Sequence, residues 1–450
     1  MSETCTTVAS RSSPVVFRGC EMRLSKASDT EGTSPHPVSA GEAWETFRPF
    51  LENTGVTRVS DITQLDRIGI PVFNVLRPSL DGYTAAHGKG FTPTAARLSA
   101  AGESLERWFG VNADIPSFRG TWNDLSRTYP MIPPEQLPLT PHSFFHRDLE
   151  IPWTLGWDLV KAEEIPVPLE LVRLSPGCGK RKLADLSEGL LFQAGSNGLA
   201  CGVHLLEAIA QALLEVVERD SVTCCTMAAR AAGCSAPVRR IARVETTPFP
   251  RVRELAERIR SAGIGMMLAE NGTDVGIPTW NCYLIDLEEQ HSIATAHGMG
   301  SAIDHETAMI RAITESVQSR CVFLSGVRDI VPSKEYRRVL RSDGAWAMQQ
   351  TEKGVSERLD LSGLKDNMIF DAFEDDVTFI LRRLASVGLD RVIVFRLSRA
   401  DDPVHAVRVV VPGAEGYLFP YYSPGARAKA AMQHGYGEGS PLFRKEGAEW

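Results

Sequence analysis

The sequence has 450 residues, of which 43% are hydrophobic and 23% are charged, as in ordinary globular proteins. Its 48 Lys and Arg against 56 Asp and Glu give a net charge of -8, which argues against a broad nucleic-acid surface. No apolar run reaches the roughly 20 residues that a membrane-spanning helix needs, and no secretory signal opens the chain. We therefore expect a cytoplasmic protein that binds neither nucleic acid nor a membrane.

The N-terminal part divides by composition. Residues 1–38 are rich in Ser, Thr, Gly and Pro with little hydrophobic periodicity, which predicts a disordered tail. Residues 39–88 are expected to form an N-terminal extension, with a short helix over residues 43–51 and turns and strands over residues 56–77. The main domain is then expected to cover residues 89–450.

Prolines punctuate the chain between residues 129 and 142, where they exclude a helix and predict a long surface connection. Further along, a helical pattern at residues 251–262 alternates with strand patterns at residues 280–287, 392–397 and 407–411. This alternation predicts an α+β protein with mixed helices and sheets.

A first polar stripe lies in residues 92–110, TPTAARLSAAGESLERWFG, which begin with a Thr-Pro helix start. At about 100 degrees per residue, Ser99, Glu103 and Glu106 fall on one side of this helix. Two carboxylates therefore face the same way.

Two further helices repeat the arrangement. The helix at residues 204–220 carries a polar stripe opposite its apolar side, made of Glu207, Gln211, Glu215 and Glu218. The helix at residues 306–320 carries another, made of Arg311, Glu315 and Gln318. Arg320 projects elsewhere on an ideal helix, so it needs a helix end or a bend to join them.

A solvated face is the plain explanation of one such stripe, but composition argues against it here. Neither of the first two helices contains the Lys that usually alternates with Glu on exposed faces. Magnesium is the natural partner, because it binds carboxylate oxygens together with phosphate oxygens and water. The sequence therefore predicts a nucleotide that is held through a metal ion.

Other motifs are weaker. Gly177–Lys180 resembles a phosphate loop but lacks its remaining residues, so we interpret Pro176–Arg181 as a turn with exposed basic residues. Lys89, between two glycines, precedes the first carboxylate helix and can reach a phosphate. His142 and His146 lack the Glu of a zinc-protease motif and are interpreted as a structural pair. The nine cysteines include no C-x-x-C pair, which weakens zinc and disulfide readings.

Together these residues resemble the YcaO family, whose members use ATP to activate peptide backbone amides. The first motif, S-x-x-x-E-x-x-E-R, matches at Ser99, Glu103, Glu106 and Arg107. The second matches at Glu207, Gln211, Glu215, Glu218 and Arg219, after the family-like run Ser196 to Ala200. The third, R-x-x-x-E-x-x-Q-x-R, matches at Arg311, Glu315, Gln318 and Arg320.

The chain departs from the family pattern at two positions. Ala200 stands where the family commonly has Ser, and Val203 stands where it has Asn. Two polar contacts to nucleotide or metal are thus missing, which puts the affinity for the nucleotide in question. The adjacent His204 either replaces one of them or is a structural hydrogen-bonding residue.

The resemblance implies a YcaO domain over residues 89–450, with ATP in a cleft. It also implies that magnesium lies between two glutamate pairs that hold it, Glu103 with Glu106 and Glu215 with Glu218. It implies that a thiol, hydroxyl or sulfide adds to an amide carbonyl, and that the oxyanion attacks ATP before phosphate leaves. No side-chain nucleophile is required. The residues implied in nucleotide binding are Lys89, Ser99, Arg107, Glu207, Gln211, Arg219, Arg311, Glu315 and Arg320.

The resemblance also implies partners: a precursor peptide or protein and a TfuA-like protein, with a homodimer as a further option. The subgroup most similar to this chain installs backbone thioamides. Azoline-forming relatives commonly end in a proline-rich tail, whereas Pro441 is the only proline in the last 20 residues of this sequence. We therefore expect a thioamide product, with azoline formation or a non-catalytic peptide-binding subunit as the alternatives.

Overall fold

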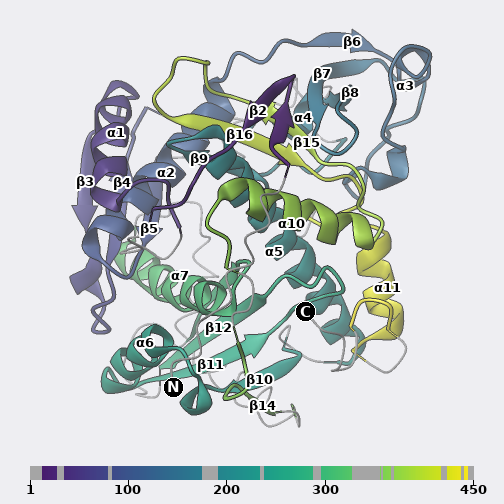
Figure 1. Cartoon of the computed structure of the whole chain (residues 1–450). Helices are drawn as coiled ribbons and strands as arrows, with labels where there is room; N and C mark the ends of the chain where they lie inside the picture. Colours follow the sequence, from purple (N-terminus) through teal and green to yellow (C-terminus); the bar gives the residue numbers. More distant parts are fainter. Residues whose placement is uncertain are drawn as a thin grey trace.

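Figure 1 shows the computed structural model of the protein. The residues it describes are 13–27, 35–79, 84–174, 191–233, 238–286, 295–326, 355, 358–365, 369–416, 423–436 and 440–443. Two large sheets lie at the top and bottom of the view, and the long helix α5 (Leu205–Ala231) runs between them. This mixture of helices and sheets confirms the expected α+β class.

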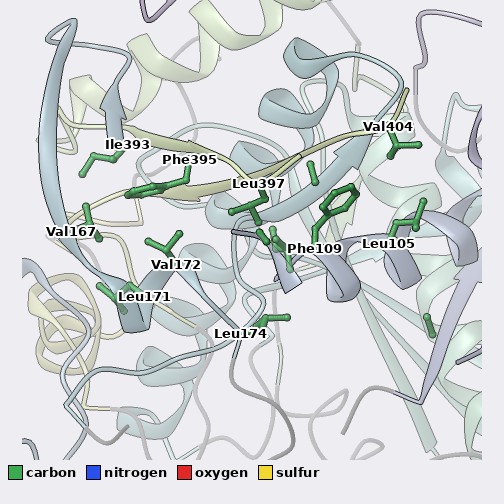
Figure 2. Packing of buried hydrophobic residues seen from close by; sticks show 14 of the residues in the cluster. Leu105, Phe109, Val167, Leu171, Val172, Leu174, Ile393, Phe395, Leu397 and Val404 are labelled. Carbon is green, nitrogen blue, oxygen red and sulfur yellow. The ribbon is translucent and has the colours of Figure 1, made fainter. Parts of the chain in front are cut away.

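The upper sheet has the strand order β6-β7-β15-β16-β9, with β8 paired to β7. Its strands are β6 (Phe118–Gly120), β7 (Ile151–Asp158), β8 (Glu163–Pro168), β9 (Leu199–Gly202), β15 (Ile393–Arg396) and β16 (His405–Val410). Side chains alternate between its faces. Phe395 belongs to the buried cluster that also contains Leu105 and Phe109 of α2 (Pro93–Asn112), part of which Figure 2 shows, whereas Val394 belongs to the cluster of α5 and α10 (Phe373–Ser386).

The lower sheet has the order β13-β12-β11-β10-β14. Its strands are β10 (Arg240–Arg243), β11 (Ile264–Glu270), β12 (Thr279–Asp286), β13 (Thr295–Ser301) and β14 (Arg358–Asp360), and it packs against α6 (Pro250–Ser261) and α7 (His305–Ser325). Helix α7 lies almost directly on β13. A Cβ on Gly298 would stand 2.2 Å from the Ser316 nitrogen, so glycine is required for this approach.

A three-stranded sheet, β3 (Arg58–Asp61), β4 (Val72–Leu76) and β5 (Ala85–Lys89), packs against α2. The expected turn-and-strand character of residues 56–77 is confirmed. Helix α2 begins as predicted, because the Thr92 side chain accepts a hydrogen bond from the Ala95 amide (3.2 Å). A Cβ on Gly88 would stand 2.0 Å from the Ala100 nitrogen, so β5 and α2 are in close contact.

Helix α1 (Ala40–Asn53) is longer than the expected 43–51, because Ser39 and Glu42 form a capping box that starts it earlier. The proline-rich stretch is free of α-helix, as predicted, although Ile132 within it is buried. The other short elements are α3 (Trp122–Leu125), α4 (Leu169–Val172), α11 (Ala426–His434), η1 (Thr63–Leu65), η2 (Pro134–Gln136) and η4 (Val244–Thr246).

Two further interpretations from the sequence concern a turn that resembles a phosphate loop and the pair of His142 and His146. The turn predicted for Pro176–Arg181 lies outside the residues that the structure describes. His142 and His146 are both exposed, and within the described ranges no three His, Cys, Asp or Glu side chains gather closely enough to hold a metal on their own. The same ranges contain no helix with the length and hydropathy needed to cross a membrane.

The disordered tail predicted for residues 1–38 is wrong for the hairpin formed by β1 (Val15–Phe17) and β2 (Cys20–Met22). Val15 and Phe17 are buried in the cluster formed by α5 and α10. Lys26 pairs with Asp376 of α10 at 2.7 Å. The sequence did not reveal this hairpin, because two three-residue strands are too short to show a period.

Removing residues 1–27 is expected to lower the melting temperature by several degrees. The deletion exposes the apolar surface beneath the hairpin and leaves Asp376 without Lys26; burial already raises the pKa of this carboxyl to about 6. Thermal unfolding followed by circular dichroism measures the change. Removing residues 1–12 alone is the control and should leave the melting temperature unchanged, because none of these contacts involves them. Equal melting temperatures for both deletions would show that the hairpin contributes nothing.

Candidate active site

A cavity of about 700 Å³ lies where α2, α5 and α7 meet β5, β9 and β13. All but one of the residues that the sequence assigned to nucleotide or metal binding line it; these are Lys89, Ser99, Glu103, Glu106, Arg107, Glu207, Gln211, Glu215, Glu218, Arg219, Arg311 and Glu315. The three polar stripes therefore face one shared space.

Helix α2 is tied to β5 through Glu103. Its carboxylate accepts a hydrogen bond from the His87 amide (2.6 Å) and pairs with Arg107 one turn further along. Arg107 also donates to the Ala85 carbonyl (2.5 Å). Arg107 thus neutralises the charge of Glu103, and the hydrogen bond from His87 fixes the Glu103 carboxylate at the cavity wall.

Glu106 is placed differently. Its carboxylate accepts a hydrogen bond from the Cys201 amide of β9 (3.1 Å). On α5, Arg219 lies 3.9 Å from Glu215 and 3.7 Å from Glu218, too far for close ion pairs. These carboxylates are only loosely balanced by arginine.

The pKa values reflect this crowding. Burial raises the pKa of Glu106 to about 8, and the charges of Glu215 and Glu103 add to the effect. Burial also raises the pKa of Glu215 to about 7, although Arg219 opposes it, and raises the pKa of Glu218. Ionised carboxylates in this space need a further positive charge.

These carboxylates fit a magnesium ion bound with a nucleotide. Mg²⁺ usually takes one or two protein carboxylates and completes its shell with phosphate oxygens and water. The desolvated pairs on α2 and α5 would supply the protein oxygens.

Lys89 of β5 and Arg311 of α7 bring positive charge into the cavity. Lys89 pairs with Glu315 at 2.5 Å, and although burial alone would raise the pKa of Glu315, Lys89 lowers it below its usual value. Arg311 donates to the Ser301 carbonyl (2.8 Å) and to the Gln211 side chain (2.7 Å). Lysine and arginine side chains so placed can bind phosphate oxygens.

Arg320, which the sequence assigns to nucleotide binding, is the one residue of that set that does not line the cavity. Helix α7 continues to Ser325, so neither a helix end nor a bend turns Arg320 toward the stripe. Its guanidinium is buried and pairs with Asp66 (3.0 Å) and Asp286 (3.4 Å). Arg320 therefore joins α7 to β12 and to the segment after β3.

Comparison with known protein families identifies the family of this chain. The model of a family described as YcaO cyclodehydratase, ATP- and Mg²⁺-binding, matches residues 87–415. The chain belongs to the YcaO family. It is thus a member of a family that binds ATP and Mg²⁺, and the matched range includes all the predicted cavity residues.

Relatives at the sequence level extend beyond this range. An uncharacterized protein of Methanothermobacter thermautotrophicus is 31% identical over 414 residues, covering 88% of this chain and 100% of its own length. A protein of Rhizobium leguminosarum bv. trifolii, named as uncharacterized and lying in the tfuA 3' region, is 29% identical over 389 residues, covering 84% of this chain and 88% of its own.

Solved structures share the YcaO fold. YcaO from Methanopyrus kandleri, bound with AMPPCP and Mg²⁺, has a TM-score of 0.65 and 22% identity, covering 89% of this chain and 100% of its own. A heterocyclase in complex with substrate and cofactor has a TM-score of 0.72 and 19% identity, covering 92% of this chain. The chain spans only 56% of that heterocyclase.

The YcaO cavity also contains residues that the sequence did not single out, among them His36, Cys201 and His297. Burial raises the pKa of the Cys201 thiol well above its usual value, so this thiol is a poor nucleophile. Burial lowers the pKa of His297 to about 4, and its ring stacks on Tyr283 at 4.8 Å. None of these residues belongs to a motif, which left no signal to find them.

The two departures from the YcaO pattern do line the cavity, and Ala200 is buried in its wall beside Val203. His204 replaces neither lost contact. Its Nδ1 accepts a hydrogen bond from the Leu206 amide (3.1 Å), which caps α5. Of the two alternatives for His204, the structure therefore agrees with a structural hydrogen-bonding residue.

Proposed function

We propose that this chain is an ATP- and Mg²⁺-dependent enzyme that converts a backbone amide of a peptide or protein into a thioamide. The observation that carries the proposal is the cavity of a YcaO chain in which two glutamate pairs, on α2 and α5, share one space with Lys89 and several arginines. Such a set suits phosphoryl transfer, where the protein positions the reactants and neutralises charge.

The proposed reaction balances without a side-chain nucleophile. Hydrosulfide adds to the amide carbon, and the resulting oxyanion takes the terminal phosphoryl group of ATP, releasing ADP. The C–O bond then breaks, phosphate leaves with the former amide oxygen, and the C=S bond forms. The proton of hydrosulfide leaves with the phosphate, so amide, hydrosulfide and ATP give thioamide, ADP and hydrogen phosphate.

The cavity residues divide between two tasks in this proposal. The magnesium ligands would be Glu103, Glu106, Glu215 and Glu218, and bound magnesium would neutralise phosphate charge. Lys89, Arg107, Arg219 and Arg311 would face the phosphates, while Ser99, Glu207, Gln211 and Glu315 would complete the nucleotide site.

A TfuA-like protein is the proposed partner, and sulfide or a sulfide-releasing compound is the proposed sulfur source. Support comes from the relative in the tfuA 3' region, which aligns with most of this chain. The heterocyclase likeness supports the fold and is neutral about the product, since azoline formation would use the same amide activation.

The test is incubation of the protein with ATP, Mg²⁺, sulfide, a TfuA-like partner and a precursor peptide encoded nearby. A thioamide adds about 16 Da to the peptide in a step that consumes ATP. Loss of one water at a Cys, Ser or Thr without sulfide would identify an azoline-forming enzyme instead. Peptide binding without ATP turnover would identify a non-catalytic subunit.

A further inference from the structure

His36 reaches the nucleotide cavity from outside the region matched by the family model, which begins at residue 87. Its Nδ1 lies 2.6 Å from Oε1 of Glu207, in the first turn of α5. An ionised carboxylate can only accept hydrogen bonds, so Nδ1 of His36 carries the proton and donates it. This is a charge-assisted bond at the cavity wall.

Glu207 transmits this contact to the turn that precedes α5. Its other oxygen, Oε2, accepts a hydrogen bond from the Val203 amide (2.8 Å). A Cβ on Gly202 would stand 2.5 Å from the same oxygen, so the carboxylate lies directly on the turn. Glu207 is only 2% exposed, which makes an unsatisfied oxygen there costly.

The Gly202–Val203 turn, which the His36–Glu207 contact supports, lies at the part of the cavity wall where the chain departs from the family pattern. Val203 and Ala200 line the cavity at the two sites where the chain lacks the polar side chains of the family pattern. His204 is already occupied as the cap of α5. His36 contacts Glu207, and Glu207 in turn holds the Val203 amide at one of the two positions where a polar side chain is missing.

His36 is itself held by the N-terminal segment. Its carbonyl accepts a hydrogen bond from the Ala27 amide (2.8 Å), and the neighbouring Lys26 pairs with Asp376. Helix α1 begins four residues later and contributes Ala43 and Phe47 to the cavity. Apolar side chains of this kind suit the nucleoside part of ATP better than its phosphates.

We propose that His36 is a positioning residue of the nucleotide site, which fixes Glu207 and the Gly202–Val203 turn against the nucleoside end of ATP. The inference rests on the proposed function, in that it takes ATP to be the ligand of the cavity. His36 thereby supplies from the N-terminal segment an ordering contact that Ala200 and Val203 cannot provide.

The test measures the dissociation constant of AMPPCP with Mg²⁺ by calorimetry on the full chain. His36→Ala should weaken binding about tenfold, which corresponds to about 1.4 kcal/mol. His36→Asn keeps an N–H donor near the place of Nδ1 and should stay within about threefold of the wild type. His146→Ala changes an exposed histidine outside the cavity and should bind like the wild type.

Steady-state kinetics adds a second measurement. His36→Ala should raise the KM for ATP and leave kcat nearly unchanged, because the contact orders the binding site rather than the reacting atoms. Melting temperatures of all variants separate a general loss of stability from a loss of binding.

Two results would overturn the inference alone: wild-type affinity in His36→Ala, or equally weak binding in His36→Asn and His36→Ala. If His36→Ala fails to fold, comparison of His36→Asn with His36→Gln decides the point, because Gln moves the donor one bond further out. No binding of AMPPCP by the wild-type protein would instead refute the proposed function, and the inference with it.

Discussion

Replacing Glu106 or Glu218 with glutamine is expected to abolish magnesium-dependent ATP hydrolysis while the fold stays intact. A neutral amide binds the hard Mg²⁺ ion more weakly than a carboxylate does. Losing the several kcal/mol that a metal contributes to a phosphoryl-transfer transition state lowers the rate about a hundredfold or more. Phosphate release with partner and peptide present measures the rate, and Glu135→Gln, at an exposed position, is the control.

The same Glu106→Gln substitution is expected to stabilise the protein when magnesium is absent. Burial raises the pKa of Glu106 to about 8 from an ordinary 4.5. Between these values the folded state keeps a proton that the unfolded state releases, so the free energy of unfolding falls as the pH rises toward 8. Glutamine does not titrate and escapes this loss.

Melting curves at pH 5 and pH 8 distinguish the outcomes. At pH 8 without metal, Glu106→Gln should melt above the wild type, and at pH 5 the two should be nearly equal. Adding Mg²⁺ with AMPPCP should raise the melting temperature of the wild type more than that of the variant. Wild-type hydrolysis in both glutamine variants would refute the metal assignment.

Much of the cavity could be predicted from local sequence because it is built on helix faces. A period of 3.6 residues fixes which side chains of one helix share a side, so Glu103 and Glu106 could be paired before any fold was known. The lack of lysine on these stripes indicated that their charge is used in a site. The helix starts at Thr92 and Asp304 follow ordinary capping chemistry.

Contacts between distant segments could not be predicted in this way. The close approach of α7 to β13 depends on Gly298, whose meaning appears only once the two elements are side by side. His36 lies in a segment without periodicity, and its partner Glu207 is 171 residues away in the chain. Helical periodicity gives the direction in which a side chain points from its own helix axis. It does not give the residues of other segments that the side chain contacts.

Arg320 illustrates this limit and allows a decisive test. It matches the third family motif, yet the structure places it in a buried cluster with Asp66 and Asp286, which also pairs with Arg67 (2.9 Å). Replacing one member of a buried ion cluster leaves uncompensated charge in the interior. Arg320→Met is therefore expected to lower the free energy of unfolding by about 3–5 kcal/mol.

Urea unfolding of Arg320→Met measures this loss, and calorimetry with AMPPCP and Mg²⁺ shows whether the nucleotide site is affected. Arg260→Met is the matched control, because Arg260 pairs with Glu257 on the exposed side of α6, and such surface pairs contribute about 1 kcal/mol or less. A structural Arg320 predicts a large loss of stability with nearly unchanged affinity in the folded protein. Weak AMPPCP binding with wild-type stability would return Arg320 to the nucleotide site. A loss of affinity without a loss of stability requires that the side chain takes part in binding directly.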